Sequence, residues 1–471
     1  MQATLGIGLP ADAHPARRVR PPAPVPPDKP LGALQMLAAL RRNPIEAWNE
    51  LHFNLPMLSG KNVLGHVTVA AAPAAIRHIL VDNAANYRKD DLQLRILSTG
   101  LGDGLLRAEG EAWKRTRRIV APLFTPRQVR TFAPAMQAGA DRLLARWARR
   151  GNAFEIDVSE EMTRFTYDVL AQTLFSGALD ADSDAFSRAM TRYLTASGRI
   201  DPLDVLGAPD WIPRIGKIMA RPALKFFEES VTGIVARRRA MIGRGETPPR
   251  DLLTALIEAG DPEGGKGLTE IEIAANIITF IGAGHETTAN ALTWTLYLLS
   301  QAPDIRAGAE EEADGAAAAA ADSADLVETL PLIRASFEEA MRLYPPAPML
   351  SRAAIRDDEV MDVKIPAGSL VLLPPYVLHR HRLLWRDPEH FAPERFLPEN
   401  RGRIDRFAYL PFGAGPRICV GMGFAMMEAI IALAAVLKHY RLDYAGAQPP
   451  HPLNRITLRP RDGMMMRVAA R

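Results

Sequence analysis

The longest regular pattern in the chain is a run of apolar residues, spaced three or four apart, between residues 270 and 300. At 1.5 Å per residue, a helix of this length would be about 45 Å long. That length is enough to cross a whole domain. The pattern therefore predicts one long helix around which the rest of the chain is arranged.

Most of the remaining sequence also has helical spacing. Apolar residues recur three or four apart in residues 129–150, 160–175, 224–242 and 423–440. Strand-like runs are few and short, and lie at 62–70, 369–373 and 455–467. The predicted fold class is mainly α with small β-sheets.

Composition excludes several classes of protein. Of the 471 residues, 48% are hydrophobic and 24% are charged, as in an ordinary globular chain rather than a disordered one. The formal charge of +3 is too small to indicate nucleic acid binding. A single cysteine, Cys419, excludes an intramolecular disulfide and a cysteine-rich metal site.

The two ends of the chain bear on domain organisation and location. Residues 1–30 are rich in proline and lack the apolar core of a signal peptide, so we expect an extended lead-in before a single domain at 31–471. The best membrane-span candidate, Ala425 to Leu437, is short and contains Glu428. We therefore expect a soluble, cytoplasmic protein without a membrane anchor.

Cys419 lies in a loop rich in glycine and proline, residues 411–421, just before a helical pattern. Taken alone, a single cysteine is usually a small buried hydrophobe. Here the backbone could approach a flat ligand closely, Phe412 offers a ring and Arg417 offers a cation. An apolar loop favours a thiolate only if a metal cation bonds the sulfur directly.

The pattern Phe-x-x-Gly-x-Arg-x-Cys-x-Gly at 412–421 resembles the heme-thiolate signature of the cytochrome P450 superfamily. The resemblance implies that the Cys419 thiolate is the axial metal ligand of heme b. It also implies that Phe412 packs over the sulfur and that Arg417 pairs with a heme propionate. Motif order resembles the family from about residue 22 onward, which implies one cytochrome P450 domain with a helix-rich lobe and a β-rich lobe.

The middle of the long helical pattern contains Gly282 and Gly284, which weaken a helix. Thr287 can turn its hydroxyl to the carbonyl of Ala283 and open the helix locally. A buried helix with glycines for close packing would explain the same residues. The resemblance implies that Ala283 lies beside the heme and that Glu286 and Thr287 are the acid–alcohol pair that delivers catalytic protons.

Glu339 and Arg342 lie one helical turn apart, a spacing that alone predicts an exposed ion pair. In the cytochrome P450 family, which the chain resembles, such a pair contacts a later arginine in a buried three-residue network that positions the cysteine loop. We call this network the lock. Arg395 matches the position of that later arginine.

Trp113 and Arg117 are also one turn apart and alone would form a buried aromatic beside a solvated basic face. The resemblance implies that this pair binds a heme propionate, with Arg352 as a second candidate. Neighbouring cations Lys114, Arg115 and Arg118 would then form a positive patch that steers an acidic redox partner.

The function implied by the resemblance is O2-dependent monooxygenation of a hydrophobic small molecule. Electrons would come from a separate ferredoxin, flavodoxin or flavoprotein reductase. Two alternatives stay open: a heme-thiolate peroxygenase or isomerase, and a non-catalytic heme sensor or carrier. Neither alternative explains why both Glu286 and Thr287 are present.

Overall fold

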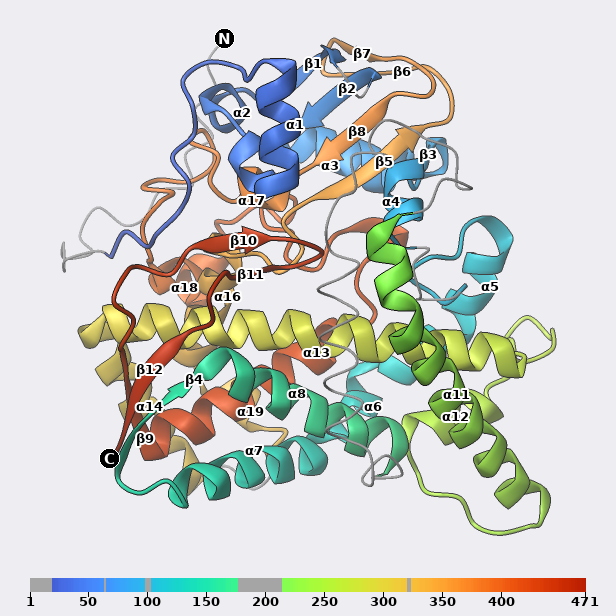
Figure 1. Ribbon diagram of the computed structural model, residues 1–471, viewed down its shortest axis with the longest axis vertical. Helices are drawn as coiled ribbons and strands as arrows, with labels where there is room; N and C mark the ends of the chain where they lie inside the picture. The colour runs from blue at the N-terminus through green and yellow to red at the C-terminus, as the bar shows by residue number, and fades with distance from the viewer. Residues whose placement is uncertain (1–18, 63–64, 98–102, 177–213, 320–322) are drawn as a thin grey trace.

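The computed structural model describes residues 19–62, 65–97, 103–176, 214–319 and 323–471. A β-rich lobe lies at the top of Figure 1, and a larger helical lobe lies below it, crossed from side to side by α13 (Glu270–Gln301). The prediction of a mainly α fold with small sheets is confirmed.

The β-rich lobe is built on one sheet with the strand order β1-β2-β8-β5-β3. Only the β2–β8 pair is parallel, while the other neighbours are antiparallel. The strands are β1 (Met57–Asn62), β2 (Gly65–Ala70), β3 (Tyr87–Arg88), β5 (Leu350–Ala354) and β8 (Leu370–Leu373). The helices labelled beside this sheet are α1 (Ala33–Arg42), α2 (Glu50–Asn54), α3 (Pro73–Arg77), α4 (Asp91–Leu97) and α17 (Pro375–Leu378).

The helical lobe packs around α13 (Figure 1). The other helices are α5 (Gly110–Val120), α6 (Pro126–Arg130), α7 (Ala133–Ala148), α8 (Val158–Phe175), α11 (Ile215–Gly243), α12 (Leu252–Glu258), α14 (Pro303–Ala319), α15 (Leu326–Thr329), α16 (Pro331–Leu343), α18 (Pro398–Arg401) and α19 (Met422–His439). Small sheets β4-β12-β9, β10-β11 and β6-β7 complete the fold. Their strands are β4 (Ala153–Asp157), β6 (Asp358–Val360), β7 (Val363–Ile365), β9 (Tyr440–Tyr444), β10 (Pro452–Asn454), β11 (Leu458–Pro460) and β12 (Met465–Ala470).

Helix α13 begins at a capping box, in which the Thr269 hydroxyl accepts from the backbone of Glu272 and the Glu272 carboxylate accepts from the backbone of Thr269. Its second half is buried almost without interruption. Helix α8 packs across its middle, where a Cβ on Gly284 would lie only 3.1 Å from the Leu170 side chain. The glycine thus permits close packing, and α13 crosses the core as the sequence predicts.

Two predicted elements are divided in the structure. The expected helix 129–150 is broken between α6 and α7, because Pro134 lies in the first turn of α7 and cannot donate a backbone hydrogen bond to a continuous helix. Of the expected strand 62–70, Asn62 is the last residue of β1 and Gly65–Ala70 form β2, which pairs with β1 in an antiparallel hairpin. Gly65 adopts a φ of +89° at the start of β2. Such a φ favours glycine.

Helix α19 is the one described helix that is long and apolar enough to span a membrane by length and composition. It packs against α7, α13, α14 and α16, and residues from Met427 to Ala434 are buried. Its apolar composition is therefore explained by its place in the core.

Part of the proline-rich lead-in contacts the folded chain. The Tyr344 hydroxyl donates to the Pro22 carbonyl at 2.7 Å, and the backbone N–H of Phe391 donates to the Val19 carbonyl at 2.9 Å. These contacts tie the lead-in to the same region as α16.

Candidate active site

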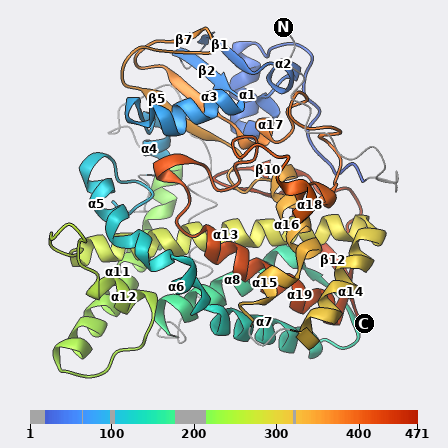
Figure 2. The same ribbon diagram turned by 180° about the vertical axis from the view of Figure 1, so that it is seen from behind.

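The cysteine loop leads from the β-rich lobe to α19 (Figure 2). The backbone N–H of Cys419 donates to the Phe412 carbonyl at 2.9 Å, which closes the loop. Gly413 and Gly415 both have a φ of +72°. A Cβ on Gly415 would lie 1.8 Å from the Leu80 carbonyl oxygen. Gly415 is therefore required both by the backbone conformation and by the close approach of the neighbouring segment.

The Cys419 side chain is exposed, yet burial among protein atoms raises the pKa of its thiol. The N–H of Gly421 and the charge of Arg117 act in the opposite direction. The two observations are compatible if solvent reaches the Cys419 side chain while most of the atoms around it belong to the protein. A flat ligand with a metal cation fits this environment, because the cation would stabilise the thiolate that burial disfavours.

Ala283 is exposed in the middle of α13, although Ile281 and His285 on either side are buried. The Thr287 hydroxyl donates to the Ala283 carbonyl at 2.7 Å, as the sequence predicts. On the other side of the helix, the Thr166 hydroxyl of α8 lies 2.9 Å from the His285 carbonyl and can donate to it. The segment that contains Ala283 therefore offers an exposed helix face and backbone carbonyls that accept additional hydrogen bonds from threonine hydroxyls, while α13 stays continuous.

The Glu286 carboxyl group is largely enclosed, with 13% of its side chain exposed, and burial raises its pKa. Arg459 on β11, 3.9 Å from Oε1, and the Thr457 hydroxyl lower that pKa in part. Asn290 donates to the same Thr457 hydroxyl at 3.1 Å. A carboxyl group with a raised pKa retains a proton closer to neutral pH, which suits a proton donor. Thr457 and Arg459 carry no motif that would identify them in the sequence.

A cluster of cations and one aromatic ring forms where α5 meets the cysteine loop. The Arg417 guanidinium stacks on the Trp113 ring with 4.2 Å between its central carbon and the ring centroid. Arg417 and Lys89 share the Glu109 carboxylate, at 2.6 and 2.9 Å. Arg417 also donates to the Ala108 carbonyl at 3.2 Å.

Charges in this cluster repel one another. Burial is the main cause that lowers the pKa of Lys89, to about 8, followed by the charge of Arg417. Burial and then Arg417 also lower the pKa of Arg352. Burial lowers the pKa of Arg117, and the negative charge of a Cys419 thiolate acts in the opposite direction and raises that pKa. The structure thus brings the predicted propionate-binding residues close to Glu109 and Lys89, which the sequence analysis missed.

The donor set fits heme. Lys89, Arg117, Arg352 and Arg417 carry positive charge, and Glu109 is the carboxylate paired with two of them. The carboxylates of a heme would offset the excess charge. The exposed sulfur of Cys419 and the exposed Ala283 provide open surfaces for a flat ring.

Glu339, Arg342 and Arg395 lie together in the interior. Arg342 donates through Nε and Nη2 to the two Glu339 oxygens at 2.6 and 2.7 Å, and both side chains have no exposed surface. Arg395 Nε lies 3.4 Å from Glu339 Oε1. Arg342 also donates to the carbonyls of His379, Pro388 and His390 at 2.7 to 2.9 Å. The three side chains thus connect α16 to the segment that precedes the cysteine loop.

The expected positive patch beside Trp113 is largely neutralised. Arg115 pairs with Glu272 at 2.6 Å and donates to the Gly267 carbonyl, while Arg118 pairs with Asp261 at 3.2 Å. These two cations therefore attach α5 to residues 261–272. Lys114 is paired with the exposed Glu111 at 2.7 Å.

Comparison with known proteins identifies the family of the chain. Residues 24–467 match the family model described as Cytochrome P450. The chain is 32% identical to cytochrome P450 3A16 of Mus musculus over 425 residues, which cover 86% of this chain and 82% of that protein. It is 31% identical to cyclooctatin synthase of Streptomyces melanosporofaciens over 394 residues, which cover 84% and 83%.

The crystal structure of the cytochrome P450DA heme domain superposes with a TM-score of 0.80 at 27% identity, covering 96% of this chain and 99% of that chain. The fold and these comparisons together define a heme-binding oxygenase. The chain belongs to the cytochrome P450 family. It is a monooxygenase, and its cofactor is heme.

Proposed function

We propose that this monooxygenase binds heme through Cys419 and hydroxylates a hydrophobic small molecule, with proton delivery through Glu286 and Thr287. The observation that carries the proposal is the Cys419 side chain, which is exposed in a desolvating environment beside Arg117. When bound, heme supplies the oxygen activation, and the protein supplies ligand, orientation and proton path.

Each side chain has a distinct part in this proposal. Phe412 packs over the sulfur of Cys419. Trp113, Arg117, Arg352 and Arg417 hold the heme carboxylates by charge and by hydrogen bonds, which fixes the orientation of the ring.

The lock of Glu339, Arg342 and Arg395 acts at a distance from the reaction. It is proposed to position the cysteine loop, supported by its contacts with backbone carbonyls that precede that loop. A rigid loop keeps the metal ligand in place without contributing a reacting atom.

Proton delivery is supported by two observations on α13. The Thr287 hydroxyl is bonded to the Ala283 carbonyl, and the pKa of Glu286 is raised by burial. In the proposal, the Glu286 carboxyl group takes up a proton at the end of the helix face that is close to Arg459. The Thr287 hydroxyl then passes a proton toward the exposed face at Ala283.

The electron donor in this proposal is a separate ferredoxin, flavodoxin or flavoprotein reductase. A hydrophobic substrate is supported by the apolar side chains near the Ala283 segment, where Phe280 packs edge-to-face on Phe124 with 5.4 Å between ring centroids. A cytoplasmic location and the lack of a membrane anchor stay predictions.

The test of the metal ligand is Cys419→Ala, with Met465→Ala, an exposed residue of β12, as a control. We expect Cys419→Ala to lose the thiolate-dependent absorption spectrum of the reduced carbon-monoxide complex, while the control keeps it. A spectrum unchanged by Cys419→Ala would refute the assignment.

The test of proton delivery compares two threonines with the same bond on the same helix. Thr287 and Thr295 each donate to the carbonyl four residues earlier at 2.7 Å. We expect Thr287→Ala to keep heme but to divert NAD(P)H electrons to peroxide or superoxide. Thr295→Ala should keep the normal ratio of product to NAD(P)H. Equal ratios in the two variants would argue against the relay while leaving heme binding intact.

A further inference from the structure

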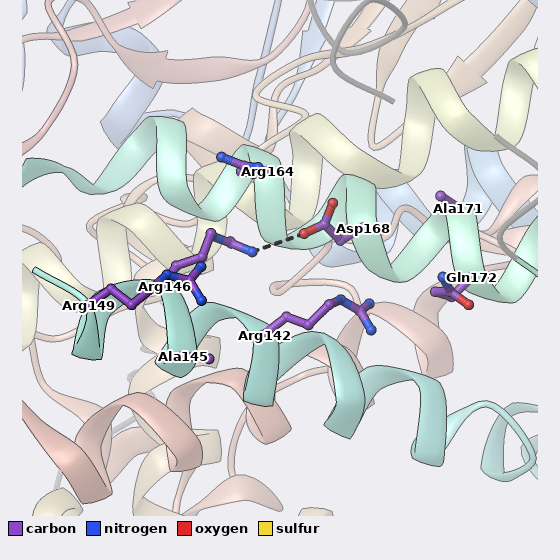
Figure 3. A pocket seen from close by; sticks show the side chains of 8 residues that line it. All are labelled: Arg142, Ala145, Arg146, Arg149, Arg164, Asp168, Ala171 and Gln172. Atoms are coloured by element: carbon purple, nitrogen blue, oxygen red, sulfur yellow. Dashed lines mark hydrogen bonds and ion pairs between the residues drawn. The ribbon is translucent and has the colours of Figure 1, made fainter. Parts of the chain in front are cut away.

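A cavity of about 500 Å³ lies between α7 and α8. Figure 3 shows that arginine and alanine side chains from α7 and the residue that follows it, and charged, amide and alanine side chains from α8, surround it. The lining residues are Arg142, Ala145, Arg146, Arg149, Arg164, Asp168, Ala171 and Gln172. None of them belongs to the candidate active site, so the cavity needs a separate explanation.

The way in which α7 and α8 pack leaves charged side chains, rather than large apolar ones, on the face of α8 that lines the cavity. Gly139 allows α7 to approach α8 closely, since a Cβ there would lie 2.6 Å from Val169. The buried Phe165 and Thr166 belong to the face of α8 that packs toward the core. Arg164 and Asp168 are one turn apart and lie on the face that lines the cavity.

The cavity carries an excess of positive charge. Arg146 Nη1 pairs with Asp168 at 3.1 Å and its Nε lies 3.7 Å from Glu161. The four lining arginines outnumber these two carboxylates by two charges. Such an excess favours an anion.

Some of the arginine donors are buried without an acceptor. Nη2 of Arg142, and both Nε and Nη2 of Arg146, are buried and have no hydrogen-bond partner within the part of the chain that the structure describes. Only 15% of the Arg146 side chain is exposed. A buried donor without an acceptor is unfavourable, and an anion's oxygens would relieve it after small rotations of the side chains.

Desolvation of the cluster supports the same conclusion. Burial lowers the pKa of Arg146 and raises the pKa of Asp168, although the two groups form an ion pair. Repulsion from Arg164 lowers the pKa of Arg146 further. Burial therefore disfavours the charged form of both partners, even though they are paired.

We propose that this cavity binds a small polyanion of the oligophosphate class. Guanidinium groups match phosphate oxygens through paired hydrogen bonds. Two or more negative charges are needed to offset the excess, which a single carboxylate would not supply. The cavity has the volume of a small-molecule site. The unpartnered donors of Arg142 and Arg146 are recessed between two helices rather than spread over the flat surface that a protein partner would need.

The test uses the full heme-loaded chain and sodium tripolyphosphate as the probe, measured by calorimetry and by the shift in Tm. The variant Arg149→Gln/Arg164→Gln changes two exposed lining arginines and leaves the partly buried Arg146–Asp168 pair intact. Its matched control, Arg77→Gln/Arg467→Gln, removes two exposed arginines from other elements.

We expect tripolyphosphate to raise Tm and the lining variant to weaken binding at least tenfold, about the effect of one lost charged hydrogen bond. The control should bind as the unchanged chain does. Adenosine triphosphate binding more tightly than tripolyphosphate would support the site and identify a nucleotide as the source, whereas equal affinities would support oligophosphate alone.

Three results with small anions would overturn the proposal. They are the absence of tripolyphosphate binding at millimolar concentration, equal weakening in the two double variants, and citrate binding as tightly as tripolyphosphate. Loss of an acidic ferredoxin's binding in the lining variant, with no small anion bound, would also overturn it in favour of a protein-docking surface.

Discussion

Removal of the charge on Glu339 should destabilise the domain more than removal of the charge on its neighbour Glu338. Glu339 accepts from Arg342 at 2.6 and 2.7 Å and from the backbone N–H of Ala392 at 2.8 Å, and it lies 3.4 Å from Arg395. Glu339→Gln keeps the volume but removes the carboxylate charge that two buried guanidinium groups share. Breaking such a network costs about 3–5 kcal/mol.

That cost is large for a protein domain, whose total stability is about 5–15 kcal/mol. We therefore expect Glu339→Gln to reduce the yield of soluble protein and its heme content. The free energy of unfolding, from urea denaturation, and the ratio of heme to protein would measure the two effects. Arg342→Leu should behave similarly, because it leaves the Glu339 charge buried.

Glu338→Gln is the matched control. Glu338 is also buried, but its nearest cations, Arg334 and Arg401, are 3.6 Å away and partly exposed. Burial raises the pKa of Glu338 despite these arginines, so the folded chain disfavours its charged form. Replacement by a neutral side chain should cost little. Equal stability and heme content in Glu339→Gln and Glu338→Gln would refute the role of the lock.

Two further predictions concern the cysteine loop and the long helix. Gly415→Ala should reduce heme content, because its Cβ would lie 1.8 Å from the Leu80 carbonyl oxygen. Gly402→Ala should not, because no atom lies within 4 Å of the added Cβ. Equal heme content in the two variants, measured by absorption, would contradict this prediction. Burial lowers the pKa of His285 to about 4, and its Nδ1 lies 2.9 Å from the Ile281 carbonyl. The unfolded chain therefore binds a proton below pH 6.5 that the folded chain does not, and the free energy of unfolding should fall by about 3 kcal/mol between pH 6.5 and 4. Urea denaturation of His285→Gln should show a smaller fall, and an equal fall would exclude His285 as its cause.

The sequence allowed prediction of residues whose chemistry is concentrated in short motifs. The cysteine loop combines glycines, an aromatic ring and a cation within ten positions, so its close approach to a ligand can be inferred locally. Thr287 is similar, because its bond to the Ala283 carbonyl depends only on helical spacing. The fold class follows from periodicity, and the break before α7 depends on one proline, Pro134.

Other parts of the site depend on contacts between distant segments. Lys89 and Glu109 matter because the fold brings them to Arg417, more than 300 residues later. Arg459 reaches Glu286 from the β10–β11 hairpin in the same way. No local pattern marks these residues, since a single lysine, glutamate or arginine is usually a solvated surface group.

The two clusters of buried charge in the candidate site differ in a way that separates structure from ligand binding. At Glu339, the carboxylate and backbone carbonyls accept nearly every hydrogen bond that Arg342 can donate. Such a cluster is complete within the protein. Around Trp113, cations exceed the single carboxylate that pairs with them, and the pKa of Lys89 falls to about 8.

An excess of partly buried cations is unfavourable for folding alone, because all of the charges lose hydration while too few carboxylates are present to compensate them. It is retained where an anionic ligand supplies the missing charge, the part that we propose for the heme carboxylates beside Trp113. The cost of Lys89 to folding and its contribution to heme binding can be separated by measuring the folding stability of Lys89→Met with and without heme. Without heme, the variant should be more stable than the unchanged chain. On heme binding, it should gain less stability than the unchanged chain. The same gain in both chains would show that Lys89 does not contact the cofactor.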